Sequence, residues 1–308
     1  MKSKVMKWTL VGVVAAYLFI ITFGTVVILH VLCEKHVEYH RVYDAAEAGL
    51  PAPDTLSLLT SDGYRIRTLE ITPESAPKGV IICLTGIETP SVTAYYGHVR
   101  SFRELGLVSL LTEVRGHGAS DGERICLAYQ ETADVKAVTD YVNSRYPCLP
   151  VIVMGLSMGA AVAIRAIAEN RDIDAMISLS AFSSLQDFIS WHAGRFISPF
   201  LAEPLRLTSA LAASSKFGVN AFRATPYEAI GHLDGRPALL MHSRGDSQVP
   251  FMCFEKLFAR AESATSKLRT YVVDGDEHFI TASFGIPEDD PEYSAVLLGF
   301  IKDVMAMQ

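Results

Sequence analysis

Short apolar runs alternate along most of this chain with longer segments that read as helices. The runs typical of buried strands are Gly79–Leu84, Val108–Thr112, Val151–Met154, Ala175–Leu179 and Pro237–Met241. Leu268–Val273 alternates enough to add another strand, and Thr55–Thr60 with Tyr64–Ile71 predict an opening hairpin. The segments between them predict helices at Ala94–Leu105, Leu127–Tyr146 and Met158–Asn170. Alternating strands and helices predict an α/β fold, with a mainly parallel sheet covered by helices on both faces.

The N-terminal segment has a different pattern, since Trp8–Leu32 contains no charged residue. As a helix it would be roughly 37 Å long, enough to cross a hydrocarbon core of about 30 Å. A transmembrane helix and an export signal both fit. Because no small-x-small cleavage site follows, an uncleaved anchor at residues 1–35 is favoured. The lysines that precede the span, Lys2, Lys4 and Lys7, favour a single-pass protein with an extracytoplasmic catalytic domain at residues 36–308.

The longest stretch between two predicted strands lies at about 181–235. It is rich in large apolar residues and is interrupted by Pro199 and Pro204. Helices here would form a short cap over the crevice at the carboxyl ends of the strands. An ordinary peripheral helix pair and a mobile lid explain this segment equally well.

Charge and composition exclude several classes of function. The net charge is −7, and the lysines and arginines are scattered, which leaves no basic stripe for nucleic acid. The chain contains no metal-ligand spacing, P-loop or dinucleotide-binding glycine motif, so the chemistry is expected to need neither a metal nor another cofactor. The five cysteines show no disulfide framework.

The strongest chemical signal is the sequence Gly155-Leu-Ser157-Met-Gly159, between a predicted strand and a predicted helix. A sharp strand-to-helix turn exposes a serine hydroxyl as a nucleophile, and the flanking glycines leave room for that turn. The first N–H of the following helix would help to hold a developing oxyanion. The alternative is a tight turn in which Ser157 only caps the helix.

A nucleophilic serine needs a base and an acid that orients the base, and both candidates follow in the chain. Asp246 comes just after the strand Pro237–Met241, and His278 comes just after Leu268–Val273. Both strands end at the edge of the sheet where ligands bind in open α/β folds. We therefore expect His278 to accept the proton of Ser157 and Asp246 to orient the imidazole. The acidic residues next to His278 are more simply explained as a solvated loop.

Taken together, these motifs resemble the α/β-hydrolase family, in particular the exported or membrane-tethered serine hydrolases related to monoacylglycerol lipases and serine aminopeptidases. The resemblance covers roughly residues 55–305. It rests on the serine motif, the loop Arg115-Gly-His-Gly118 and the segments that contain Asp246 and His278. It implies an α/β-hydrolase fold and an oxyanion hole formed by the N–H groups of Ile87 and Met158.

Two residues depart from the pattern of this family. Thr85 stands where histidine is common and Glu113 where aspartate is common. Neither change removes a group that transfers a proton. The loop around Arg115 is expected to be structural, with the guanidinium in a local ion pair.

The predicted function is a membrane-anchored serine hydrolase that cleaves carboxylic esters or thioesters through an acyl-enzyme on Ser157. The apolar cap and the anchor suggest an acyl ester or lipid as substrate. A serine peptidase or aminopeptidase is the nearest alternative, because the fold does not fix the substrate. A non-catalytic binding protein on the same scaffold is a further alternative, although such proteins usually lose a member of the triad.

Overall fold

A single sheet forms the centre of the molecule. The computed structural model describes residues 2–307, without the side chains at positions 2, 3, 199 and 201. Within these residues the sheet has eight strands in the order β1-β2-β4-β3-β5-β6-β7-β8. β1 and β2 form an antiparallel hairpin, β2 is antiparallel to β4, and all the other neighbours are parallel. The strands are β1 (Asp54–Leu59), β2 (Arg65–Ile71), β3 (Gly79–Leu84), β4 (Leu107–Thr112), β5 (Val151–Leu156), β6 (Ala175–Leu179), β7 (Ala238–Ser243) and β8 (Leu268–Val273).

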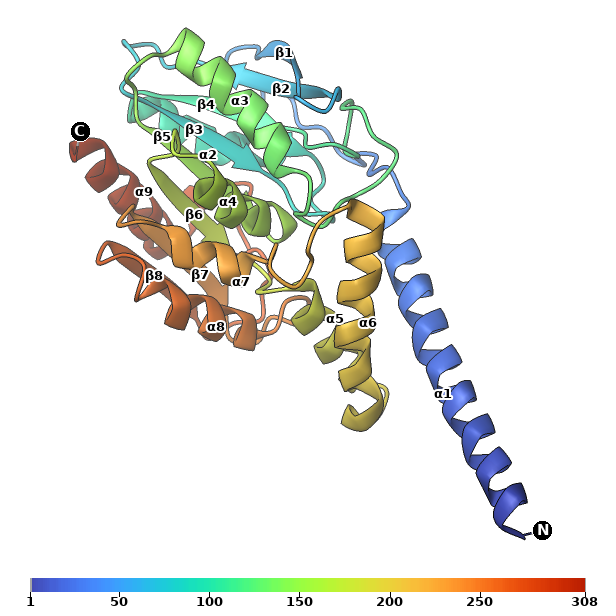
Figure 1. The fold of residues 1–308 in the computed structure, drawn as a ribbon. Helices are drawn as coiled ribbons and strands as arrows, with labels where there is room; N and C mark the ends of the chain where they lie inside the picture. The colour runs from blue at the N-terminus through green and yellow to red at the C-terminus, as the bar shows by residue number, and fades with distance from the viewer. Residues whose placement is uncertain (1, 308) are drawn as a thin grey trace.

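Helices cover both faces of this sheet (Figure 1). On one face lie α2 (Tyr96–Glu104) and α9 (Pro291–Ala306), and on the other lie α3 (Thr132–Arg145), α4 (Met158–Glu169) and α8 (Phe251–Ala261). The shorter helices are η1 (Val92–Tyr95), α7 (Pro226–Ala229), η2 (Ile230–His232) and η3 (Pro287–Asp289). The predicted fold class, a mainly parallel sheet flanked by helices, is therefore confirmed.

The central strands show why the sheet needs helices on both sides. In β3, Val80 and Ile82 point into one hydrophobic cluster, whereas Ile81 and Cys83 point into the other. All four residues are completely buried. Successive side chains of a strand face opposite sides, so a continuous apolar run requires an apolar layer on each side.

The predicted helix at Leu127–Tyr146 begins too early, because α3 starts only at Thr132. Leu127 and Ala128 have positive φ angles of 52° and 69°, which no α-helix contains. Their segment is held by tertiary contacts instead. The guanidinium of Arg165, on α4, donates to the carbonyl oxygens of Ala128 and Tyr129, so those carbonyls do not accept helical hydrogen bonds.

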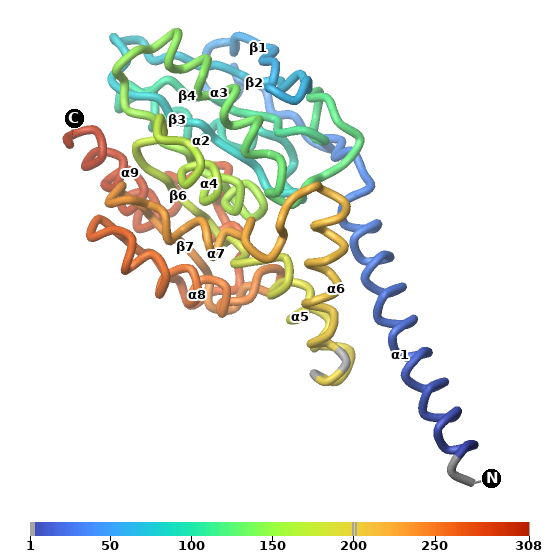
Figure 2. Tube along the Cα trace, viewed as in Figure 1, coloured from blue at the N-terminus to red at the C-terminus, as the bar shows by residue number. Residues whose placement is uncertain are grey.

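Two further helices lie between β6 and β7, and another precedes β1. α5 (Leu185–Gly194) and α6 (Pro199–Phe217) occupy the segment predicted as a cap. α1 (Lys2–Cys33) extends away from the sheet with the N-terminus at its far end, and α6 lies beside it (Figure 2). Within the described residues, Lys4–Cys33 is the one helical segment long and apolar enough to cross a membrane, a property that signal sequences share.

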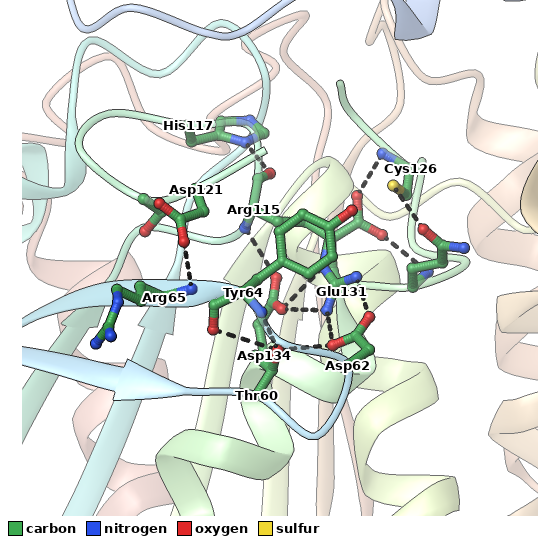
Figure 3. A network of polar contacts seen from close by, with 12 residues as sticks. Thr60, Asp62, Tyr64, Arg65, Arg115, His117, Asp121, Cys126, Glu131 and Asp134 are labelled. Atoms are coloured by element: carbon green, nitrogen blue, oxygen red, sulfur yellow. Dashed lines mark hydrogen bonds and ion pairs between the residues drawn. The ribbon is translucent and has the colours of Figure 1, made fainter. Parts of the chain in front are cut away.

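A buried ionic network holds the loop that follows β4 (Figure 3). The guanidinium of Arg115, almost completely buried, donates to both carboxylate oxygens of Asp62 at 2.6 and 3.0 Å. It also donates to the carboxylate of Asp134 at 2.7 and 2.9 Å. Arg115 therefore forms the expected ion pair, but its partners lie 53 and 19 residues away in the chain.

Glu131 is a second buried carboxylate beside this network and accepts hydrogen bonds from the N–H groups of Cys126 and Gln130. Burial, reinforced by the charge of Asp134, raises its pKa from 4.5 to about 7. The folded state thus retains a proton that the unfolded chain has already released. This residue consequently makes the protein less stable as the pH rises through that window.

Replacing Glu131 by glutamine is expected to flatten the pH dependence of stability between about pH 4.5 and 7. Across this window the free energy of unfolding of the wild type should fall by up to about 3 kcal/mol because of Glu131. In the variant it should fall only by what other groups contribute. Thermal unfolding of both proteins at several pH values measures the difference. Glu262→Gln, at an exposed position after α8, serves as the control. Equal slopes of stability against pH for wild type and Glu131→Gln would contradict the prediction.

Candidate active site

Ser157 lies in a strained turn between β5 and α4. Its φ and ψ angles are 54° and −115°, a conformation that non-glycine residues rarely adopt. The turn is held on both sides, since the N–H of Ser157 donates to Leu179 at 2.8 Å and its carbonyl oxygen accepts from Ala160 and Ala161. The side chain does not cap the helix. The turn is therefore not the simple capping turn that the sequence left open as the alternative.

Glycines are required around this turn because backbone segments approach each other closely. A Cβ atom on Gly155 would lie 2.1 Å from the carbonyl oxygen of Gly159. One on Gly159 would lie 2.5 Å from the carbonyl oxygen of Leu84, at the end of β3. The prediction that the flanking glycines make room for the turn is confirmed.

Asp246 and His278 come together although 32 residues separate them. The Nδ1 of His278 lies 2.7 Å from Oδ2 of Asp246, a hydrogen bond that the ring donates to the carboxylate. β7 and β8 are parallel neighbours, so the loops after them leave the same edge of the sheet. Among the described residues, Nε2 of His278 is buried and has no hydrogen-bond partner. This ring atom is therefore free to exchange a proton with a group in the cavity.

The second carboxylate oxygen of Asp246 accepts from the N–H groups of Gln248 and Val249, at 2.8 and 2.9 Å. Burial by itself raises the pKa of this carboxyl. The hydrogen bonds from His278 and from the two amides outweigh burial, and the pKa lies below its usual value. Asp246 is thus a carboxylate at neutral pH, as an acid that orients an imidazole must be.

Two serines that the sequence analysis did not single out hold the backbone of the loop that contains His278. The hydroxyl of Ser180, just after β6, donates to the carbonyl oxygen of His278 at 2.8 Å. The hydroxyl of Ser243, at the end of β7, donates to that of Glu277 at 2.6 Å. Both serines end parallel strands at the crevice, a position that marked them as candidates for contacts with the loops.

His242 contacts the loop that contains Asp246. Its Nε2 donates to the carbonyl oxygen of Val249 at 2.9 Å and lies 3.7 Å from Oδ2 of Asp246. Burial lowers the pKa of this imidazole, which keeps it neutral. These contacts are those of a structural residue.

The residues predicted for the oxyanion hole lie at the same place. Ile87 and Met158 line one cavity together with Ser157 and His278. The hydrogen bonds between described residues include none from the N–H of Ile87 or of Met158. The loop before Ile87 is held by the N–H of Gly86, which donates to the hydroxyl of Thr89 at 3.0 Å. The N–H groups of these two lining residues therefore have no acceptor among the described residues.

The cavity has a volume of about 240 Å³ and a mainly apolar wall. Its apolar side chains come from the loop after β6, from α5 and from the loop before α3, and include Phe182, Leu185, Phe188 and Leu127. Polar side chains, among them Lys35, Glu88, His192 and Gln248, also line the cavity, but most of its surface is apolar. A pocket of this kind suits an aliphatic group better than a charged one.

Glu113 takes a structural position where the family usually has aspartate. Its side chain is buried, pairs with Arg67 at 2.9 Å and accepts from the N–H of Ala119 at 2.7 Å. The longer glutamate therefore still reaches the loop that follows β4. It does not line the cavity.

Comparisons with known proteins agree with this architecture. The family model described as "Serine aminopeptidase, S33" matches residues 75–221. The uncharacterized protein YqkD of Bacillus subtilis is 25% identical over 219 residues, which cover 70% of each chain. Human monoglyceride lipase is 32% identical over 122 residues, which cover 39% of this chain and 40% of the lipase.

Among solved structures, the esterase Pf2001 of Pyrococcus furiosus superposes with a TM-score of 0.66 at 19% identity. The match covers 87% of this chain and 98% of the esterase, and it shows the fold. The protein has the α/β-hydrolase fold. Over parts of its length the chain resembles the monoacylglycerol lipases and the matching family model, which confirms the resemblance found in the motifs.

Proposed function

We propose that this protein is a membrane-anchored serine hydrolase that cleaves carboxylic esters or thioesters through an acyl-enzyme on Ser157. The observation that carries the proposal is the 2.7 Å hydrogen bond between Asp246 and His278. It leaves Nε2 of the imidazole unpartnered in the same cavity as the serine. The lipase-like relatives and the apolar cavity support an ester with an aliphatic acyl group as substrate.

In the proposed reaction, Oγ of Ser157 attacks the carbonyl carbon while Nε2 of His278 takes its proton. The N–H groups of Ile87 and Met158 stabilise the oxyanion. The imidazolium then protonates the leaving alkoxide or thiolate, which departs and leaves the acyl group on the serine. Water, deprotonated by His278, attacks this acyl-enzyme, and the serine regains its proton as the carboxylic acid leaves. Asp246 orients the ring and stabilises its charged form throughout.

The anchor is the second part of the proposal. α1 is long and apolar enough to cross a membrane, and most of its apolar side chains are exposed to the surroundings. Lysines at positions 2, 4 and 7 precede the apolar stretch, which favours a cytoplasmic N-terminus and an extracytoplasmic catalytic domain. α1 would hold the enzyme at the surface of the bilayer.

A fluorophosphonate probe tests the nucleophile. The folded full-length protein in detergent is expected to form an adduct on Ser157, located by mass spectrometry, and Ser157→Ala is expected to form none. Absence of the adduct from folded wild type would favour a non-catalytic binding protein.

A substrate panel separates the esterase from the peptidase, which the description of the matching family keeps as the second candidate. Nitrophenyl esters of rising acyl length are expected to be hydrolysed faster than aminoacyl anilides. Most of the cavity wall is apolar, and among the described residues that line it Glu88 is the only carboxylate that could pair with the charged amino group of such an anilide. A preference for the anilides would overturn the proposed substrate class.

A further inference from the structure

α1 packs closely against the α/β domain along half its length. Its buried and half-buried residues recur at four-residue spacing, as Tyr17, Ile21, Thr25, Leu29 and Cys33. The intervening side chains are mostly exposed. One stripe of the helix therefore faces protein, and the rest of its surface is free for lipid.

The partner of this stripe is α6, which runs parallel to α1 (Figure 1). The rings of Tyr17 and Phe200 stack at 6.3 Å, and the hydroxyls of Thr25 and Thr208 lie 2.5 Å apart. Further along, Glu34 forms an ion pair with Lys216. Contacts at three successive positions along the two helices therefore fix both their separation and their register.

No flexible linker separates the end of α1 from the domain. The carbonyl oxygen of Cys33, the last residue of the helix, accepts from the N–H of Ile125 at 2.9 Å. Val37 then pairs with the loop after β4, donating to Gly116 at 2.7 Å and accepting from Gly118 at 2.9 Å. The helix is thus joined to the loop that the Arg115 network supports.

His36 strengthens this junction. Its ring nitrogens lie 2.7 Å from the carbonyl oxygens of Gly118 and Gly122, and only a protonated imidazole donates to both. Burial lowers the pKa of His36, but these two hydrogen bonds, together with the charges of Glu123 and Glu38, outweigh burial, and the net pKa is above its usual value. These contacts therefore hold the residues at the end of α1 in a fixed position against the loop after β4.

Leu32 and Lys35, at this junction, line the cavity that contains Ser157 and His278. Leu32 is half-buried and shares the wall with the apolar side chains Leu127, Leu185 and Phe188. A residue of the apolar N-terminal helix thus belongs to the same pocket as the nucleophile.

We propose that α1 is a wall of the substrate pocket as well as an anchor, and that Leu32 contacts the acyl chain and determines which chain lengths are accepted. This inference rests on the proposed esterase function, since it names the part of the pocket that would hold the acyl group. An aliphatic chain is the ligand that fits, because Leu32 shares the wall with Leu127, Leu185 and Phe188 and most of the cavity surface is apolar.

The experiment compares Leu32→Phe with wild type, both full-length and in detergent. The measured quantity is the ratio of kcat/KM for a dodecanoyl nitrophenyl ester to that for a butyryl ester, per molecule of probe-reactive enzyme. Leu32→Phe narrows the pocket and is expected to lower this ratio about tenfold, the effect of a small volume change in an apolar pocket. Leu32→Ala enlarges the pocket and is expected to raise it.

Leu18→Phe is the matched control, since the same substitution falls on an exposed position of the same helix. Its ratio is expected to equal that of the wild type. Should Leu32→Phe fail to fold, Leu32→Ala decides the question by its own ratio. Normal labelling of Ser157 with an unchanged ratio in the Leu32 variants would overturn this inference and leave the proposed function intact. Missing labelling in folded wild type would instead overturn the proposed function.

Discussion

Ester hydrolysis by Ser157→Ala is expected to fall by roughly 10⁴- to 10⁶-fold in kcat, with little change in stability. The hydroxyl is the atom that would bond to the acyl group, and alanine removes it without adding volume. Its hydroxyl makes no capping bond that the helix needs. Initial rates with a nitrophenyl butyrate, together with thermal unfolding, measure both effects.

The same prediction extends to the base. His278→Ala is expected to lose about as much activity as Ser157→Ala, and the double variant no more than either, because the two groups act as a unit. Ser263→Ala, at an exposed serine after α8, is the control and should retain full activity. Losses that simply multiply in the double variant would show that the two residues act independently and would contradict the proposed proton transfer.

Gly155→Ala is expected to destabilise the fold by about 3 kcal/mol, although it adds only one methyl group. The new Cβ would lie 2.1 Å from the carbonyl oxygen of Gly159, a backbone atom that cannot move without the helix. Relief of the clash would separate β5 from the start of α4 and shift Ser157. A displacement near 1 Å is enough to lower activity about 100-fold in the molecules that still fold.

A matched glycine elsewhere provides the control for this substitution. Gly299 lies inside α9, and a Cβ at this position would meet no atom within 4 Å. Gly299→Ala is expected to stabilise the protein by about 0.5–1 kcal/mol, because alanine is the better helix former. Thermal unfolding and the rate of fluorophosphonate labelling per folded molecule compare the two variants. If Gly155→Ala were as stable and as reactive as wild type, the close contact at the turn would not be real.

Much of the architecture was predictable because the central strands are buried on both faces. A strand such as Gly79–Leu84 must be apolar at every position, and this pattern differs clearly from that of an amphipathic helix. The hairpin was predictable from its alternation around Ser61-Asp-Gly63, and it pairs as expected. The order of Ser157, Asp246 and His278 along the chain identified the candidate site before any geometry was known.

The start of α3 and the partners of Arg115 were not predictable in the same way. The segment around Leu127 has a helical pattern, yet Arg165 from another helix takes up its carbonyl groups. Arg115 pairs with Asp62 and Asp134, which are remote in sequence. Both outcomes depend on contacts between distant segments, and local propensity carries no information about such contacts.

The sequence by itself determined the fold class, the strained turn at Ser157 and the presence of an apolar helix at the N-terminus. Each of these follows from local patterns of polarity and from glycines at fixed spacing. Only the tertiary structure brought His278 to Asp246, set Ser180 and Ser243 behind the histidine loop and made Leu32 part of the pocket. These arrangements arise because parallel strands gather their carboxyl-terminal loops at one edge, where α1 and α6 also pack.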